Sequence, residues 1–186
     1  MRSKVKQAAL LVVSGLVLSG CNLFPPNTAT PAKKPAAADY QAATAPTNVP
    51  AARLKTICYN EADLAIIRAR MLQQELTVAT LQCQTPNGAR AYEAIYTSFL
   101  KKFNSELTAN GRSLTELSRR KKFNVDVLVT EFANRTAQRP PVDKEFCARS
   151  LRAFEWTLDP KVTSLNQAPP PYDIGPEMNI HPCPPK

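Results

Sequence analysis

The residues best suited to chemistry in this chain are five cysteines and a single histidine. The cysteines stand at positions 21, 58, 83, 147 and 183, and the histidine is His181. Cysteines can form disulfides, ligate zinc or act as nucleophiles, but no CxxC pair marks a redox or metal motif. Zinc needs three or four ligands, and a catalytic histidine needs an ordered acid and nucleophile beside it. The sequence therefore predicts no metal site, no cofactor and no catalytic residue.

The carboxylates form no catalytic pattern either. Glu61 and Asp63 are explained by the start of a helix, and Glu116 by a capping box. No Gly-x-Ser-x-Gly element and no phosphate-binding glycine loop occurs, so we do not expect an enzyme. Three further glutamates lie outside the apolar stripes, as solvated side chains do: Glu75, Glu93 and Glu106.

Residues 1–20 have the layout of a secretory signal. Three cations open the segment, an apolar run of about 11 residues follows, and small residues precede Cys21. The run is too short for the ~20 residues of a membrane-crossing helix. Leu18-Ser19-Gly20-Cys21 resembles the lipobox of bacterial lipoproteins. This resemblance implies that residues 1–20 are removed and that acyl chains on Cys21 anchor the chain in a membrane.

The residue after the lipobox cysteine indicates where such a protein resides. It is Asn22 and not aspartate, which in this family implies the periplasmic face of the outer membrane. Export also places the remaining cysteines in an oxidising compartment, where disulfides form. The formal net charge of +9 becomes +6 once the three cations of residues 1–20 are removed.

The exported chain divides into three parts. After Cys21, residues 22–52 contain six prolines and ten alanines and are predicted to be a disordered or polyproline-like tether. Residues 53–158 carry the apolar periodicity of a helical domain. Residues 159–186 contain eight prolines and are predicted to be an irregular tail that Cys183 ties down.

Four helices are expected in the domain. Asn60 caps the first, which runs to about Cys83, with Leu64, Ile67, Met71, Leu76, Val78 and Leu81 facing inward. A stripe from Tyr92 to Leu107 predicts a second helix that Asn110-Gly111 ends, and a capping box at residues 113–116 begins another. Residues 123–132 alternate like a strand but also carry a helical stripe. We predict a helix there, because a lone strand has no partner. Asp143 is expected to cap the last helix, which ends near Leu158.

Four cysteines beyond Cys21 allow three pairings. Cys58 and Cys83 cannot pair, because the intervening helix holds them about 35 Å apart, while a disulfide needs Cα atoms within about 7 Å. In an up-down bundle the first helix ends where the fourth begins, which predicts a Cys83–Cys147 bridge. The tail then brings Cys183 to Cys58. The alternative, Cys58 with Cys147 and Cys83 with Cys183, requires another topology.

Two features could contact a partner. The first is the basic run, defined here as Arg119, Arg120, Lys121 and Lys122, which suits an anionic surface. It lacks the interleaved aromatic residues that bind single strands, so nucleic acid is not expected. The second is Trp156, which lies off the stripe of the last helix and either covers the tail or anchors a partner. Residues 168–172 resemble a polyproline ligand, but a strap across the bundle is favoured.

These patterns predict an all-α fold: a small, disulfide-stapled, up-down bundle of about four helices between a proline-rich tether and a proline-rich tail. The function expected is that of a non-catalytic envelope lipoprotein presenting this domain to a protein partner or an envelope assembly. The alternative is a basic-face binding module for anionic wall polymer, lipid or lipopolysaccharide, and the remote alternative is an envelope hydrolase.

Overall fold

The computed structural model describes residues 39–41, 57–172 and 178–184 of the 186-residue chain. Residues 1–20, Cys21 and most of the expected tether lie outside the described residues. The described part is a small helical bundle stapled by two disulfides, as predicted. Its elements, in chain order, are β1 (Ile57–Tyr59), α1 (Glu61–Gln82), α2 (Glu93–Lys121), α3 (Val125–Ala137), α4 (Phe146–Leu158), the 3-10 helix η1 (Leu165–Gln167) and β2 (Ile180–Pro182).

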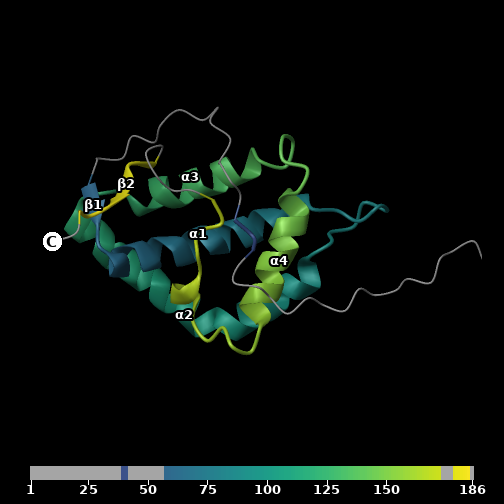
Figure 1. Ribbon diagram of the computed structural model, residues 1–186, viewed down its shortest axis with the longest axis horizontal. Coiled ribbons are helices and arrows are strands. Elements are labelled where there is room, and N and C mark those ends of the chain that lie inside the picture. Colours follow the sequence, from purple (N-terminus) through teal and green to yellow (C-terminus); the bar gives the residue numbers. More distant parts are fainter. Residues whose placement is uncertain (1–38, 42–56, 173–177, 185–186) are drawn as a thin grey trace, which may run out of the picture. The chain divides into compact units, whose positions relative to one another are not determined.

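Helix α1 is the centre of the bundle and packs against all three other helices and η1 (Figure 1). Residues are buried on most of its circumference, which is typical of a helix surrounded by protein. In Figure 1, α4 runs steeply across the direction of α1, which departs from a simple up-down arrangement. A disulfide near its first turn and Lys102 at its other end hold α4 there, since Lys102 Nζ donates to the carbonyl oxygens of Thr157 (2.7 Å) and Asp159 (2.8 Å).

The start of α1 is as predicted, and its end is not. The Asn60 side chain accepts a hydrogen bond from the backbone N–H of Asp63 at 2.8 Å, the expected cap. Leu81, which was expected to face inward, is 52% exposed. It lies in the last turn, where Val78, Ala79 and Cys83 already fill the contact with Phe146.

The prediction that Asn110-Gly111 ends a helix is wrong, because α2, which is 29 residues long, continues through both residues to Lys121. The Asn110 side chain is buried and donates to the carbonyl oxygen of Ile66 in α1 at 2.9 Å. A Cβ at Gly111 would lie 3.3 Å from the Arg70 guanidinium. Asn110 and Gly111 therefore lie where α1 and α2 pack closely against each other, and both residues fit that contact. The capping-box sequence at residues 113–116 lies inside the helix and caps nothing.

The helix predicted for residues 123–132 is confirmed from Val125 onward, where α3 begins after a cap by Asn124, whereas Phe123 and Asn124 lie in the break between α2 and α3. The last helix starts later than predicted: its N-cap is Glu145, and Asp143 accepts from the Glu145 N–H in the preceding turn. The sequence did not indicate the parallel pair of three-residue strands β1 and β2. Strands of that length carry too little alternation to be recognised.

Both predicted disulfides are confirmed. Cys58 is bonded to Cys183, and Cys83 is bonded to Cys147, with Cα separations of 4.6 and 5.7 Å. The described tail runs from α4 back to β1 as a strap. It contributes Val162, Leu165 and Ala168 to the apolar cluster between α1, α2 and α4. It contributes Tyr172, Met178 and Ile180 to the cluster between α1, α2 and α3. Pro171 and Tyr172 are themselves buried, so the polyproline segment is part of the strap.

The disordered tether predicted for residues 22–52 needs one correction. Residues 39–41 are packed on the bundle, and Tyr40 is only 1% exposed. This contact could not be predicted, because a single buried aromatic residue in a segment rich in proline and alanine gives no periodic apolar pattern. Among the described helices, none has both the length and the apolar character needed to cross a membrane.

Candidate functional site

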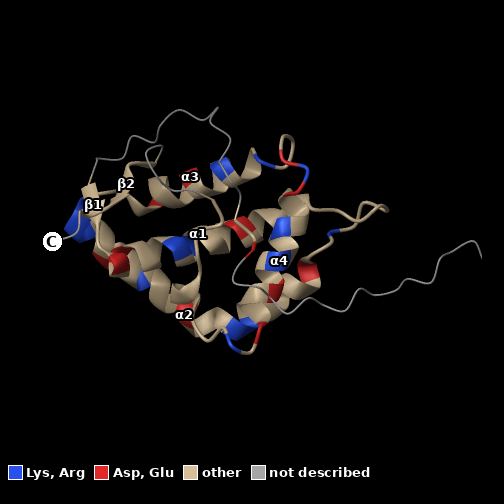
Figure 2. Ribbon diagram, in the orientation of Figure 1, with Lys and Arg blue, Asp and Glu red and all other residues tan. Residues whose placement is uncertain are grey.

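The basic run lies at the C-terminal end of α2 beside β1, where Figure 2 shows Lys and Arg gathered. Cations at this end of a helix are stabilised by the helix dipole. Arg119 and Lys122 are exposed to solvent. The Arg120 side chain is also 56% exposed, but it forms a contact within the domain, as does Lys121. Arg120 and Lys121 are called the engaged pair below.

The engaged pair holds the buried carboxylate of Asp63 in the first turn of α1. Arg120 Nη2 lies 2.9 Å from Asp63 Oδ1, and Lys121 Nζ lies 3.4 Å from Oδ2. Burial alone would raise the pKa of Asp63, but the hydrogen bond and charge of Arg120, the Asn60 contact and Lys121 together lower it below its usual value. Asp63 is therefore an anion in the folded domain that fixes the end of α2 to the start of α1.

Lys121 also joins α2 to the strand that carries the exposed disulfide. Its Nζ donates to the carbonyl oxygen of Cys58 at 2.7 Å and lies 5.3 Å from the centre of the Tyr59 ring. In β2, His181 stands opposite Cys58 in the parallel register. The described residues contain no group of three histidine, cysteine or acidic side chains that could hold a metal ion.

Trp156 is half-buried at the far end of α4 and packs against the apolar cluster of α1, α2 and the tail. The Tyr40 ring lies 5.7 Å from it, between centroids. The sequence predicts that Trp156 either covers the tail or anchors a partner, but the segment that lies against its ring is residues 39–41. These residues in turn contact the tail at Pro169 and Pro170.

A buried ion pair was missed by the sequence analysis, which expected Glu75 to be solvated. Glu75 Oε2 lies 2.6 Å from Arg139 Nη1, and their side chains are 2% and 0% exposed. The Arg139 guanidinium is 5.3 and 5.0 Å from the ring centres of Phe146 and Tyr172. Burial raises the pKa of Glu75 to about 7, although the charges of Arg139 and Arg149 oppose this.

The signal for this ion pair was present in the spacing. The placement of Glu75 outside the apolar stripe was wrong: it is four residues after Met71 and three before Val78, so it lies on the stripe of α1. A charge at such a position requires a buried partner of opposite sign, and only the fold identifies which arginine supplies it. The pair joins α1 to the turn before α4 and, through the Tyr172 ring, to the strap.

Glu106 was also expected to be solvated, but it has a structural contact. Its Oε1 accepts from the Ser164 hydroxyl at 2.7 Å and from the Leu165 N–H at 2.8 Å, which fixes the start of η1. Glu93, the third of these residues, is exposed as predicted.

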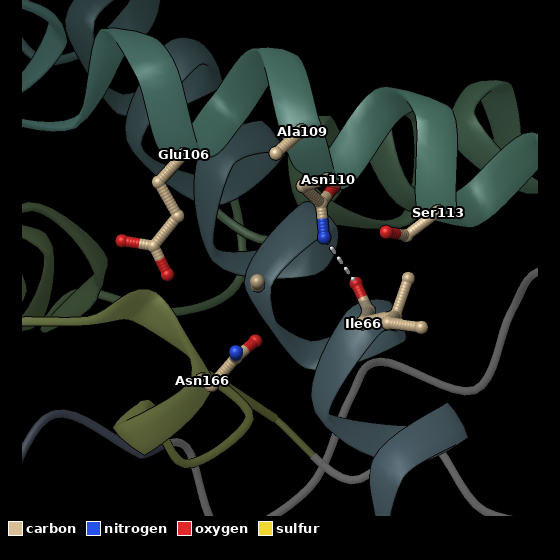
Figure 3. A pocket seen from close by; sticks show the side chains of 7 residues that line it. Ile66, Glu106, Ala109, Asn110, Ser113 and Asn166 are labelled. Atoms are coloured by element: carbon tan, nitrogen blue, oxygen red, sulfur yellow. Dashed lines mark hydrogen bonds between the residues drawn. The ribbon is translucent and has the colours of Figure 1, made fainter.

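A small pocket of about 110 Å³ lies where α1, α2 and η1 meet (Figure 3). Glu106, Asn110 and Ser113 line it from α2, with Ile66 from α1 and Asn166 from η1. Two of its polar groups already have partners, since Asn110 bonds Ile66 and Glu106 bonds η1. Pockets for drug-sized ligands are about 300–1,000 Å³, so this one suits a group of few atoms.

Comparison of the chain with known protein families, with curated protein sequences and with solved structures finds no match.

Proposed function

We propose that this chain is a non-catalytic bacterial envelope lipoprotein. It presents the disulfide-stapled bundle to a protein partner or an envelope assembly from the periplasmic face of the outer membrane. Cys21 carries the lipid, and the chain between Cys21 and the bundle sets how far the domain reaches. The mechanism is confinement: anchoring keeps the domain at high effective concentration near a target within that reach.

The observation that carries the proposal is how the cysteines are used. The four cysteines after residue 21 form two disulfides, which supports an oxidising compartment. The fifth cysteine has no partner thiol left in the chain and stands directly after Leu18-Ser19-Gly20. A lipobox resemblance and an unpaired cysteine at its last position agree on lipidation.

Metabolic labelling tests the anchor. Cells expressing the full chain are grown with an alkyne-tagged palmitate, and the purified protein is examined for the tag. We expect labelling of the native chain and none of Cys21→Ser. The Cys58→Ser/Cys183→Ser variant is the matched control, since it removes cysteines without removing the lipobox, and it should remain labelled. Equal labelling of the native chain and Cys21→Ser would contradict the proposal.

Crosslinking in intact envelopes tests the partner. The chain is crosslinked, affinity-purified and analysed by mass spectrometry, beside the Cys21→Ser variant that lacks the anchor. We expect one reproducible protein to be attached to the native chain and depleted in the variant. Attachment that does not depend on Cys21 would show that confinement by the lipid plays no part.

A second candidate function, binding to an anionic polymer or lipid, is favoured by Arg119 and Lys122, which are exposed at one end of α2. It predicts salt-sensitive retention on lipopolysaccharide or wall material. Retention should fall in Arg119→Gln/Lys122→Gln. The matched control is Lys101→Gln/Arg112→Gln, which removes the same charge from exposed positions elsewhere on α2. Equal losses in both variants would indicate net charge alone and not the basic run.

A further inference from the structure

Residues 39–41 contact the bundle through all three side chains. The Tyr40 ring is 1% exposed, lies 5.7 Å from the Trp156 ring, and its hydroxyl donates to the Pro169 carbonyl at 3.0 Å. Gln41 Nε2 donates to the Pro170 carbonyl at 2.9 Å. The first of these contacts lies on α4, and the contacts with Pro169 and Pro170 lie on the strap, 129 residues further along the chain.

An ion pair completes this set of contacts. Arg152 Nε lies 2.7 Å from Asp39 Oδ1 and donates to the Asp39 backbone carbonyl at 3.0 Å. The surface therefore matches the three residues in order: a guanidinium for the acid, an aromatic face for the tyrosine and a free carbonyl for the amide. Burial raises the pKa of the Tyr40 phenol above its usual value.

We propose that Arg152, Trp156, Pro169 and Pro170 form a docking site for a short Asp-Tyr-Gln segment, occupied in this protein by its own residues 39–41. Docking attaches the chain to the bundle partway along the tether. Fifteen residues, 42–56, separate the segment from β1, so it docks at an effective concentration of about millimolar and contacts of modest strength suffice.

The consequence for function concerns reach, and it rests on the lipid anchor proposed above. Seventeen residues separate Cys21 from Asp39, whereas 35 separate Cys21 from Ile57. At ~3.1 Å per residue, a fully extended chain spans about 55 Å in the first case and about 110 Å in the second. Docking of residues 39–41 thus halves the distance over which the lipidated domain can find its target.

Trp156 is the chain's single tryptophan, so its fluorescence reports on this site. The test uses the non-acylated Cys21→Ser chain in solution. Tyr40→Ala should shift the emission to longer wavelength and increase acrylamide quenching, whereas Tyr40→Phe, which keeps the ring, should change both much less. Arg152→Ala removes the partly exposed partner of Asp39 without disturbing the core and should give an intermediate change. Unchanged emission and quenching in Tyr40→Ala would overturn the proposal.

A peptide distinguishes a docking site from ordinary packing. A synthetic peptide of residues 36–44 added to the Tyr40→Ala chain should reverse the fluorescence change in a saturable way. The same peptide with alanine in place of tyrosine is the control and should not. Equal effects of the two peptides, or no effect of either, would show that the surface does not recognise the segment.

Reach is measured with the acylated chain on a supported bilayer by neutron reflectometry. The protein layer of Tyr40→Ala should extend up to about twofold further from the bilayer than that of the native chain. Equal layers would overturn the reach consequence. If Cys21 carries no lipid, neither chain forms a layer, yet the fluorescence result still tests the docking site.

Discussion

Each half of α1 is held by a disulfide and an ion pair, but these contacts are more deeply buried in the C-terminal half than at the N-terminal end. At the N-terminal end, Cys58 is exposed and the Arg120 side chain that pairs with Asp63 is 56% exposed. In the C-terminal half, Cys83 is 1% exposed and the Glu75/Arg139 pair is enclosed.

Burial changes what each device contributes to stability. An exposed ion pair is screened by water, so its removal costs little, whereas a buried charge that loses its partner has no water to replace it. An exposed disulfide is also open to reductants, while a buried one is protected by the fold around it. The contacts at the N-terminal end of α1 are therefore expected to be weaker and more easily broken than those of its C-terminal half.

The largest effect is expected from Arg139. At pH 8, Arg139→Met removes the partner of the buried Glu75 carboxyl, which must then either carry an unpaired charge or take up a proton above its unfolded pKa. Either outcome should destabilise the domain by about 3–5 kcal/mol in urea unfolding. The double variant Glu75→Leu/Arg139→Met removes both charges and should recover most of that loss. A loss as small as that of an exposed pair, about 1 kcal/mol or less, would contradict the expected difference between the two ends of α1.

The disulfides should open in a fixed order. Under a gradient of a small thiol reductant, Cys58–Cys183 is expected to be reduced before Cys83–Cys147, because Cys58 is exposed whereas Cys83 is 1% exposed. Its permanent removal in Cys58→Ala/Cys183→Ala should cost about 2–4 kcal/mol, since the bridge closes a 125-residue separation. Alkylation of the released thiols followed by peptide mapping gives the order, and reduction of the buried bridge first would contradict it.

The two buried carboxylates should respond to pH with opposite signs. The pKa of Asp63 is lowered on folding, so its stabilising contribution is present above the unfolded pKa of about 3.9 and is lost as the pH falls below it. The pKa of Glu75 is raised to about 7, so its contribution is full below about pH 4.3 and is lost as the pH rises through 7.

Urea unfolding between pH 3 and pH 8 measures both contributions. Asp63→Asn should flatten the loss of stability on the acid side, and Glu75→Gln should flatten the decline between about pH 4.3 and 7. A Glu75→Gln profile parallel to that of the native chain would show that burial does not raise the pKa of this carboxyl.

The smallest effect is expected at the exposed ion pair. Arg120→Ala should cost about 1 kcal/mol or less in the free energy of unfolding, because the side chain is half-exposed and Lys121 still faces Asp63. Most of that cost should disappear in 1 M salt. A salt-independent loss near that of Arg139→Met would remove the distinction between the two ends.

The elements that follow from local chemistry could be predicted from the sequence. The Asn60 cap and the helix at residues 125–137 required only local patterns. Both disulfides followed from a distance limit together with the expected up-down order of the helices. The uninterrupted α2 could not be predicted, because Asn110 and Gly111 are placed by their contacts with Ile66 and Arg70 in another helix. Glu75 and Tyr40 were missed for a related reason: their partners lie 64 and 129 residues away, and no local pattern encodes such a distance.

The most direct test of the proposed function is the intact mass of the protein purified from bacterial membranes without reductant. We predict a chain that begins at an acylated Cys21, contains residues 22–186, and takes up no alkylating reagent until reduction exposes four thiols. A chain that retains residues 1–20, or that shows a free thiol at Cys21 before reduction, would contradict the lipid anchor on which the function depends.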